Sequence, residues 1–394
     1  MRFKRNRKLL GKILLLLVML LVVMSGLAVF GCAGIKSVPE GGSGVTIANG
    51  TLFLCPAITT QGGGFGCTAP SGGGKLVALA TSGARLWEVP LETSGATGGM
   101  FGCTPAPKPV AIYGTPTVAG GLVYIGSYNG KIYAINSSLG ALRWVYPRQD
   151  KLEPIIGGTT VVRGKLYFGC SDGKVYALDA ETGDKEWEFQ TGDKIWSTPV
   201  IDGDRLFIGS FDKKLYALSA TDGSMKWEFE AEGAIAAAPL VYDDTVYIGS
   251  FDRHLYAVSA SDGSLKWEFS AERWFWTKPV AYNNTIYAGC FDGKVYALNA
   301  KSGSKVAEFD LGSPVAAWPV IVDSSVIFAS EEGKVYSLDT AANQVKQIAN
   351  LEEKIYTPLC ASNGVVYIYS EAQNLYALDA ESGARLWSLP LTSK

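Results

Sequence analysis

Residues 174–187 read KVYALDAETGDKEW, and the phrase that begins this stretch recurs along the chain. Its copies stand at 131–136, 174–179, 214–219, 254–259, 294–299, 334–339 and 374–379, with a diverged copy, KLVALA, at 75–80. The tyrosine of the phrase returns every 40 residues from Tyr176 to Tyr376, after a first interval of 43 residues from Tyr133. A fixed period of about 40 residues is typical of repeat arrays and closed propellers.

Each period predicts four short strands, as residues 194–230 illustrate. The expected strands there are WSTPVID (196–202), RLFIGS (205–210), LYALSA (215–220) and MKWEFE (225–230). Their period-2 alternation, without long helical periodicity, indicates an all-β fold. Four such strands form one propeller blade, which must stack on its neighbours to bury both faces. The copies therefore predict an eight-bladed β-propeller over residues 45–394.

Six tryptophans recur once per blade, just after the glycine that precedes the fourth strand. They are Trp87, Trp144, Trp187, Trp227, Trp267 and Trp387. We expect them to be structural, with each ring docked between neighbouring blades. Ala307 and Gln347 stand at this place in the sixth and seventh blades, so that sector is predicted to be the softest part of the ring.

The pattern A-x-D-A-x-T-G-x-x-x-W is clear at 177–187 and returns at 377–387 with Ser382 for threonine. It resembles the tryptophan-docking repeat of PQQ-like (pyrroloquinoline-quinone-type) propellers, which implies the fold but not an activity. In the quinoprotein dehydrogenases of that family, PQQ and calcium lie beneath a vicinal Cys–Cys disulfide. None of the seven cysteines here is adjacent to another. We therefore expect no PQQ, no calcium or other metal, and no catalytic residue.

A second branch of that family is the lipoprotein subunit of the outer-membrane β-barrel assembly machine, a non-catalytic scaffold. Export, length and eight blades are similar here. That branch closes its ring by pairing an N-terminal strand with the last blade. This chain instead begins with a first strand and ends with a fourth. We therefore expect closure by packing between the first and last blades.

The N-terminal segment predicts export. Residues 2–12 are basic and residues 13–30 are almost entirely apolar, which indicates a signal peptide or membrane anchor over 1–31. Gly31-Cys32 resembles a bacterial lipobox, so Cys32 is the expected lipidation site and 32–44 a flexible tether. An uncleaved anchor and free secretion are the alternatives. The expected location is the cell membrane or outer membrane, on the extracytoplasmic side.

Charge and composition exclude several functions. Without the six basic residues of the N-terminal segment, 29 Lys and Arg face 37 Asp and Glu, and such an acidic body argues against nucleic-acid binding. His254 is the sole histidine, which excludes multi-histidine metal sites. We expect a monomeric, non-catalytic scaffold that binds other envelope or membrane proteins. A PQQ-dependent dehydrogenase and a peptide- or carbohydrate-binding surface protein are the alternatives.

Four tryptophans and a lysine suggest where a ligand could bind. Trp196, Trp274, Trp276 and Trp318 lie at the start of predicted first strands, which normally line the axis of a propeller, and Lys278 lies in the same region of one of them. Counted back from the following proline, Trp196 and Trp276 occupy the same position. Lys278 and Trp318 occupy a second position, two residues nearer the proline. Positions two apart face the same side of a strand. These residues form either a ligand-binding rim at the axial mouth or core filling between blades.

We predict a disulfide between Cys67 and Cys103, which stand in the similar segments GGGFGCTAP and GGMFGCTPAP. An exported chain permits such a bond. The loop it would close spans 36 residues, so a Cys67→Ser variant should lose about 3–4 kcal/mol of unfolding free energy. Non-reducing peptide mapping and denaturant unfolding check this. Free thiols at both positions in the oxidised protein would contradict it.

Overall fold

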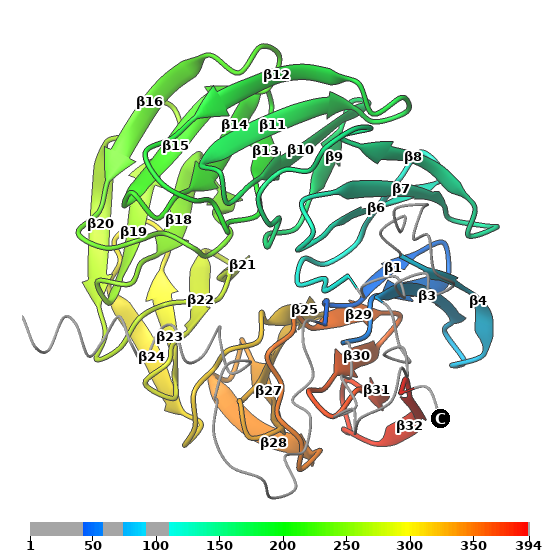
Figure 1. Ribbon diagram of the computed structural model, residues 1–394. Helices are drawn as coiled ribbons and strands as arrows, with labels where there is room; N and C mark the ends of the chain where they lie inside the picture. The colour runs from blue at the N-terminus through cyan, green and yellow to red at the C-terminus, as the bar shows by residue number, and fades with distance from the viewer. Residues whose placement is uncertain (1–41, 58–73, 92–109, 393–394) are drawn as a thin grey trace, which may run out of the picture.

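The computed structural model describes residues 42–57, 74–91 and 110–392, which form eight four-stranded antiparallel sheets. The sheets follow one another around a ring, and the last blade lies beside the first (Figure 1). The predicted all-β, eight-bladed propeller is therefore confirmed. The signal segment 1–31, Cys32, Cys67 and Cys103 lie outside the described residues. Within the described ranges, no helix has the length and apolarity needed to cross a membrane.

The strands of each blade occur in chain order from the axis outward. The first strands are β1 (Thr46–Ala48), β5 (Thr117–Ala119), β9 (Thr160–Val162), β13 (Val200–Asp202), β17 (Leu240–Tyr242), β21 (Val280–Tyr282), β25 (Val320–Val322) and β29 (Cys360–Ser362). The second strands are β2 (Thr51–Leu54), β6 (Leu122–Gly126), β10 (Lys165–Gly169), β14 (Arg205–Gly209), β18 (Thr245–Gly249), β22 (Thr285–Gly289), β26 (Ser325–Ala329) and β30 (Val365–Tyr369).

The two outer strands of each blade are longer. The third strands are β3 (Lys75–Ala80), β7 (Ile132–Asn136), β11 (Lys174–Asp179), β15 (Lys214–Ser219), β19 (His254–Ser259), β23 (Lys294–Asn299), β27 (Lys334–Asp339) and β31 (Asn374–Asp379). The fourth strands are β4 (Arg85–Pro90), β8 (Leu142–Tyr146), β12 (Lys185–Gln190), β16 (Met225–Glu230), β20 (Leu265–Ser270), β24 (Lys305–Asp310), β28 (Gln344–Asn350) and β32 (Arg385–Pro390).

The first strand of a blade is shorter than the sequence predicts. In the fourth blade the strand begins at Val200 instead of residue 196. The preceding residues bond to neighbouring blades, because the Ile195 N–H donates to the Cys170 carbonyl at 3.1 Å and the Ser197 hydroxyl to the Ala237 carbonyl at 2.9 Å. This segment therefore bridges three blades before the sheet begins.

The core lies between the blades. Among the described residues there are eight apolar clusters, and each joins one blade to the next. The cluster between the fourth and fifth blades, for example, contains Phe207 and Trp227 from one side and Ile248 and Tyr256 from the other. An equivalent cluster joins the eighth blade to the first. Closure therefore rests on packing, since no sheet contains strands from both of these blades.

In five of the eight blades the repeated tryptophan ties its blade to the next by a hydrogen bond and by close packing. The Trp227 indole N–H donates to the Ala260 carbonyl at 3.1 Å, and a Cβ at Gly263 would lie 2.7 Å from the Trp227 ring. Trp144, Trp187 and Trp267 donate to the matching carbonyls at 3.1, 3.2 and 2.9 Å. Trp387 donates to the Thr81 carbonyl at 2.9 Å and so crosses the point of closure. Trp87 contacts Gly140 of the second blade.

The seventh blade departs from this pattern. The bulge between its outer strands lies between Val335 and Tyr336, so Lys346 stands opposite Ser337, at the place that the sequence assigns to Gln347. In the sixth blade Ala307 stands opposite Ala297, as expected. Gly383 meets the Ile348 backbone of the seventh blade instead of a tryptophan ring.

We predict that the glycine under each tryptophan ring is less replaceable than a turn glycine in open space. Gly263→Ala and Gly203→Ala both place a side chain at positive φ, at 77° and 61°. The positive φ should lower the unfolding free energy by about 1–2 kcal/mol in each variant. Gly263→Ala should lose about 1–3 kcal/mol more, because its new methyl collides with Trp227, whereas Gly203 has nothing within 4 Å. Equal losses in urea unfolding would refute the packing role.

Candidate functional site

One end of the ring gathers the candidate ligand-binding residues. The turn between the second and third strands and the segment before the first strand share this end, because alternate connections of an antiparallel meander lie together. Backbone bonds join the two within each blade: Phe211 N–H donates to the Lys194 carbonyl at 3.0 Å, and Phe291 N–H to the Trp274 carbonyl at 3.2 Å. We call this end the mouth.

The strand registers place two sets of equivalent positions around the mouth. The set four residues before each first strand is called the mouth ring, and it consists of Gly42, Tyr113, Ile156, Trp196, Ala236, Trp276, Ala316 and Tyr356. The set two residues before each first strand is called the collar, and it consists of Gly44, Thr115, Gly158, Thr198, Ala238, Lys278, Trp318 and Pro358. In the mouth ring the second, fourth, sixth and eighth blades supply aromatic residues. Smaller side chains between them leave room for the larger rings.

A continuous aromatic arc runs across the fourth, fifth and sixth blades. Its members are Trp196, Phe211, Phe251, Trp274, Trp276 and Phe291, all half-buried. Ring centroids of Trp196 and Phe211 lie 4.6 Å apart, those of Phe211 and Phe251 5.9 Å, and Phe251 stacks on Trp276 at 5.5 Å and 7°. Trp274 lies 6.4 Å from Phe251 and 5.6 Å from Phe291. Three of the predicted tryptophans thus share one surface.

The three phenylalanines of the arc were missed by the sequence analysis. Each stands directly before the aspartate of the turn between second and third strands, at Phe211, Phe251 and Phe291. Their 40-residue spacing shows that they occupy equivalent turns. It does not show that their rings contact tryptophans of the mouth. The contact between Phe251 and Trp276 joins different blades and depends on the ring being closed around a common axis.

Lys194 and Trp196 mark the fourth-blade end of the arc. The Lys194 ammonium lies 5.0 Å from the Trp196 ring centroid and 4.6 Å from that of Phe211, in cation–π contact. The Trp196 indole N–H is buried and has no hydrogen-bond acceptor among the described residues. A buried donor without an acceptor costs free energy, and a ligand could supply the acceptor.

Each collar residue follows the mouth-ring residue of its blade by two positions. Its positions in adjacent blades touch, because the Gly158 N–H donates to Thr198 Oγ1 at 2.8 Å and a Cβ at Gly44 would lie 2.5 Å from Thr115 Oγ1. Lys278 and Trp318 are the two large members. Within the described ranges Lys278 has no ion pair or hydrogen-bond acceptor, and its burial alone lowers its pKa. Trp318 belongs to the collar and has no ring contact with the aromatic arc.

The seventh and eighth blades make the opposite side of the mouth acidic. Glu331 and Glu371 occupy the place of the arc phenylalanines there. The Tyr356 hydroxyl donates to Glu331 Oε1 at 2.8 Å, and Lys354 pairs with the same carboxylate at 3.4 Å. Burial and this carboxylate raise the pKa of Tyr356 to about 12. The mouth is therefore apolar on one side and charged on the other.

The repeated turn aspartates already have partners. Asp212 Oδ1 accepts from the Lys214 N–H at 3.0 Å, while Oδ2 accepts from the Tyr216 hydroxyl and the Gly192 N–H, both at 2.7 Å. The described part of the chain contains no group of three His, Cys, Asp or Glu that could hold a metal ion. His254, in the equivalent turn of the fifth blade, bonds to Asp252 of that turn and to Ser270 of β20.

The described cysteines are free thiols. Cys55, Cys170 and Cys290 are buried and Cys360 is half-buried. Burial raises the pKa of Cys290 to about 12 and that of Cys360 to about 11, which keeps both protonated and weakly nucleophilic at neutral pH. These thiols therefore add no reactive group to the mouth.

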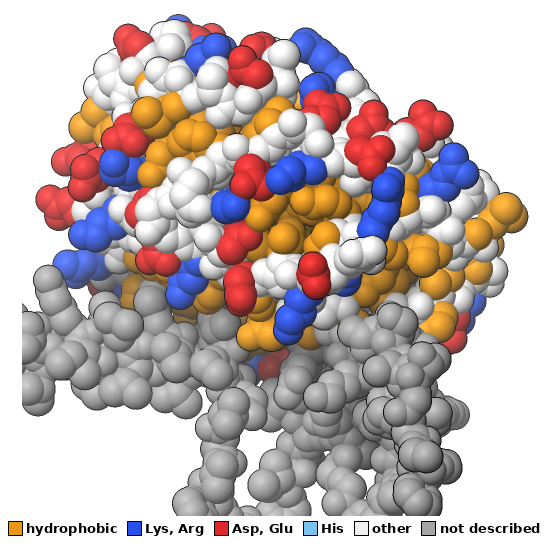
Figure 2. Space-filling view, turned by 45° about the horizontal axis from the view of Figure 1, so that its top comes forward, with side chains coloured by type: hydrophobic (Ala, Val, Ile, Leu, Met, Phe, Trp, Pro, Cys, Tyr) orange, Lys and Arg blue, Asp and Glu red, His pale blue; other side chains and the backbone are white. Residues whose placement is uncertain are grey.

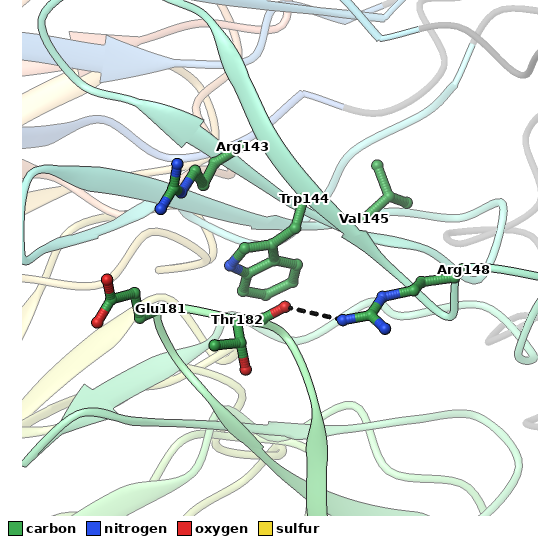
Figure 3. Close-up of a pocket in the computed structure, with 6 residues that line it drawn as sticks. All are labelled: Arg143, Trp144, Val145, Arg148, Glu181 and Thr182. Carbon is green, nitrogen blue, oxygen red and sulfur yellow. Dashed lines mark hydrogen bonds between the residues drawn. The ribbon is translucent and has the colours of Figure 1, made fainter.

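A shallow hollow of about 530 Å³ lies on the outer wall between the second and third blades (Figure 3). It is lined by Arg143, Trp144, Val145, Arg148, Glu181 and Thr182. Trp144 is the docking tryptophan of its blade, and Arg148 pairs with Asp184 at 2.7 Å, so the lining is engaged in holding blades together. Elsewhere on the outer wall, acidic and basic side chains alternate with exposed apolar ones (Figure 2).

Comparisons with known proteins bear on the fold and the family. Residues 109–361 match the model of the family described as "Beta-alanine-activating enzyme, beta-propeller". The structure of BamB from Moraxella catarrhalis superposes with a TM-score of 0.65 at 18% identity, over 86% of this chain and 94% of that one. The structure of the computationally designed Ika8 protein superposes with a TM-score of 0.66 at 12% identity, over 86% of this chain and 95% of that one. No curated protein matches the sequence. Identities this low indicate a shared fold alone.

We predict that Lys278→Met stabilises the folded protein at pH 7. Burial lowers the pKa of Lys278 from its ordinary 10.5, so the folded state holds its charge less readily than the unfolded chain does. The wild type should gain stability as pH rises through the folded pKa, and the advantage of Lys278→Met should shrink by pH 10. Denaturant unfolding at both pH values checks this, with exposed Lys301→Met as control. An unchanged or lower stability at pH 7 would contradict it.

Proposed function

We propose that this chain, which belongs to the propeller family described as "Beta-alanine-activating enzyme, beta-propeller", is a non-catalytic scaffold. It binds partner proteins at its mouth. The observation that carries the proposal is the aromatic arc across the fourth to sixth blades. Six half-buried rings from three blades form one apolar surface there, in stacked and edge-to-face contact. Aromatic side chains are the most frequent energetic anchors of protein interfaces.

The arc is suited to binding because its geometry is set before a partner arrives. Phe251 is held between Phe211 and Trp276, and Phe291 lies beside Trp274, so these rings lose little freedom on binding. Lys194 lies over the rings of Trp196 and Phe211 and adds a cation at the edge of the apolar surface. An apolar centre with a polar edge is the common composition of protein interfaces.

We further propose that the ring is tethered to the extracytoplasmic side of a membrane. The basic and apolar segment 1–31 and the lipobox-like Gly31-Cys32 support this. The first described residue, Gly42, belongs to the mouth ring, and a tether that precedes it would join the propeller at its mouth. The resemblance to the lipoprotein scaffold of outer-membrane assembly, and the fold shared with BamB, favour a role in envelope or outer-membrane protein assembly.

Two other functions remain candidates on specific observations. The tryptophan-docking repeat at 177–187 resembles that of PQQ-like propellers, so oxidoreductase activity with PQQ and calcium is one. Reduction of an artificial quinone acceptor by the purified protein, supplied with PQQ, calcium and an alcohol or sugar, would replace the scaffold proposal. The aromatic arc could also hold a carbohydrate, since sugars pack on aromatic faces. Quenching of tryptophan fluorescence by a sugar, lost in Trp276→Ala, would favour that function.

We predict that a photo-crosslinking amino acid at Phe251 captures a defined protein in cells. Phe251 lies in the middle of the arc, and the matched control is the same amino acid at Leu265, which is 47% exposed on the outer wall of the same blade. Adducts should form at position 251 and not at 265, as mass spectrometry of the products checks. Equal adducts at both positions, or none at 251, would contradict binding at the mouth.

Trp276→Ala added to the chain that carries the crosslinker should lower the adduct yield at least tenfold. Removing a central aromatic anchor costs about 2 kcal/mol or more of binding free energy. The melting temperature should be measured in parallel, because in the wild type Trp276 stacks on the ring at position 251. A fully folded variant with an unchanged yield would show that the arc does not carry the interaction.

A further inference from the structure

The inner surface of the mouth carries a single charge. The mouth ring and the collar together comprise sixteen positions, and Lys278 is the one charged residue among them. The other members are apolar, glycine, threonine or tyrosine. The acids of the seventh and eighth blades stand in the outer turns, where Glu331 is engaged by Lys354 and Tyr356. Among these sixteen positions a ligand therefore meets one cation, while Lys194 and Glu331 lie beside the ring at Trp196 and Tyr356.

Two hydrogen-bond donors in this wall have no acceptor in the described part of the chain. One is the Lys278 ammonium, whose pKa is lowered by burial with no nearby carboxylate to oppose the shift. The other is the buried Trp196 indole N–H. They come from the sixth and fourth blades, on either side of Ala236 and Ala238 of the fifth. Unsatisfied donors on both sides of small residues favour an anionic ligand that supplies acceptor oxygens.

We propose that the mouth binds the C-terminal carboxylate of a polypeptide, with Lys278 as its counter-ion and the last side chain against the aromatic arc. The proposal rests on the proposed function, in which the partner is a protein. The proposal specifies which part of the partner protein the mouth recognises: the C-terminal end of the chain, with an apolar last residue. The bond to Lys278 is an ion pair, and no covalent step is involved.

The spacing of Trp276 and Lys278 favours a chain end over an internal acidic residue. Trp276 and Lys278 are both half-buried, whereas Phe275, Thr277 and Pro279 beside them are buried, so the two share the accessible side of a segment that bends at Thr277. A C-terminal residue carries its carboxylate and its side chain on one Cα, so both can reach these neighbouring groups. In an extended chain, an internal Asp or Glu and the apolar residue next to it point to opposite faces.

The test compares two peptide pools on the full-length protein in detergent micelles. Both pools contain random heptapeptides followed by phenylalanine, and they differ in ending in a free carboxylate or in an amide. Retention by immobilised protein is quantified by mass spectrometry. The wild type should retain the acid pool at least tenfold more strongly than the amide pool. Lys278→Gln should lower the retention of the acid pool to that of the amide pool, and Lys278→Arg should keep most of the preference.

Each other outcome overturns a defined part of the proposal. Equal retention of both pools by the wild type, or a preference that survives in Lys278→Gln, refutes carboxylate recognition. If both pools bind equally and Trp276→Ala releases them, the mouth still binds protein chains and the proposed function stands. Retention of neither pool refutes peptide capture at the mouth. Competition by N-acetylphenylalanine as strong as that of a retained octapeptide would show that the ligand is a small carboxylic acid.

Should Lys278→Gln lose its fold, Lys278→Met provides the same test without a charge at this position. Its melting temperature is compared with that of the wild type before the pools are applied. The exposed Lys301 gives a matched control, since Lys301→Gln removes a cation far from the mouth and should leave the acid preference unchanged.

Discussion

The contact between the tryptophan of one blade and the glycine turn of the next is the constraint on which the rest of the structure depends. A single blade leaves both faces apolar, so it is stable only between neighbours. The indole ring fills the space that a side chain at the next glycine would take, and its N–H binds the carbonyl beside that turn. Trp387 and Thr81 extend this arrangement across the join, and the ring therefore closes without a shared sheet.

Regular spacing of the blades brings equivalent residues to equal height around the axis. A substitution at one mouth position can then change the proposed binding surface while the tryptophan contacts between blades stay the same. Phe211, Phe251 and Phe291 build an apolar arc, and the same position makes the opposite side acidic with Glu331 and Glu371. In the mouth ring, Ala236 and Ala316 leave room for the larger rings of neighbouring blades. The fold and the site are therefore specified by different positions of one repeat.

Much of this fold could be predicted from the sequence, because the 40-residue period repeats the docking tryptophan and its glycine. The site was only partly predictable. Counting from the strand prolines found Trp196 and Trp276, but Phe251, which joins the two through Phe211, resembles an ordinary turn residue. The short first strands were missed because residues such as Ile195 bond to another blade, and strand patterns do not encode contacts between blades. The displaced bulge before Tyr336 likewise depends on pairing that no periodicity reveals.

At the mouth, a residue proposed to serve binding, Lys278, has a desolvated charge that lowers the stability of the fold. Eight apolar clusters and the tryptophan clamps hold the described blades together at a distance from the axis. Lys278 belongs to none of those clusters, and burial lowers its pKa. On the outer strands, by contrast, Lys174 has the Glu188 carboxylate at 2.6 Å. The unpaired cation is the feature of the mouth that the proposed carboxylate ligand would neutralise.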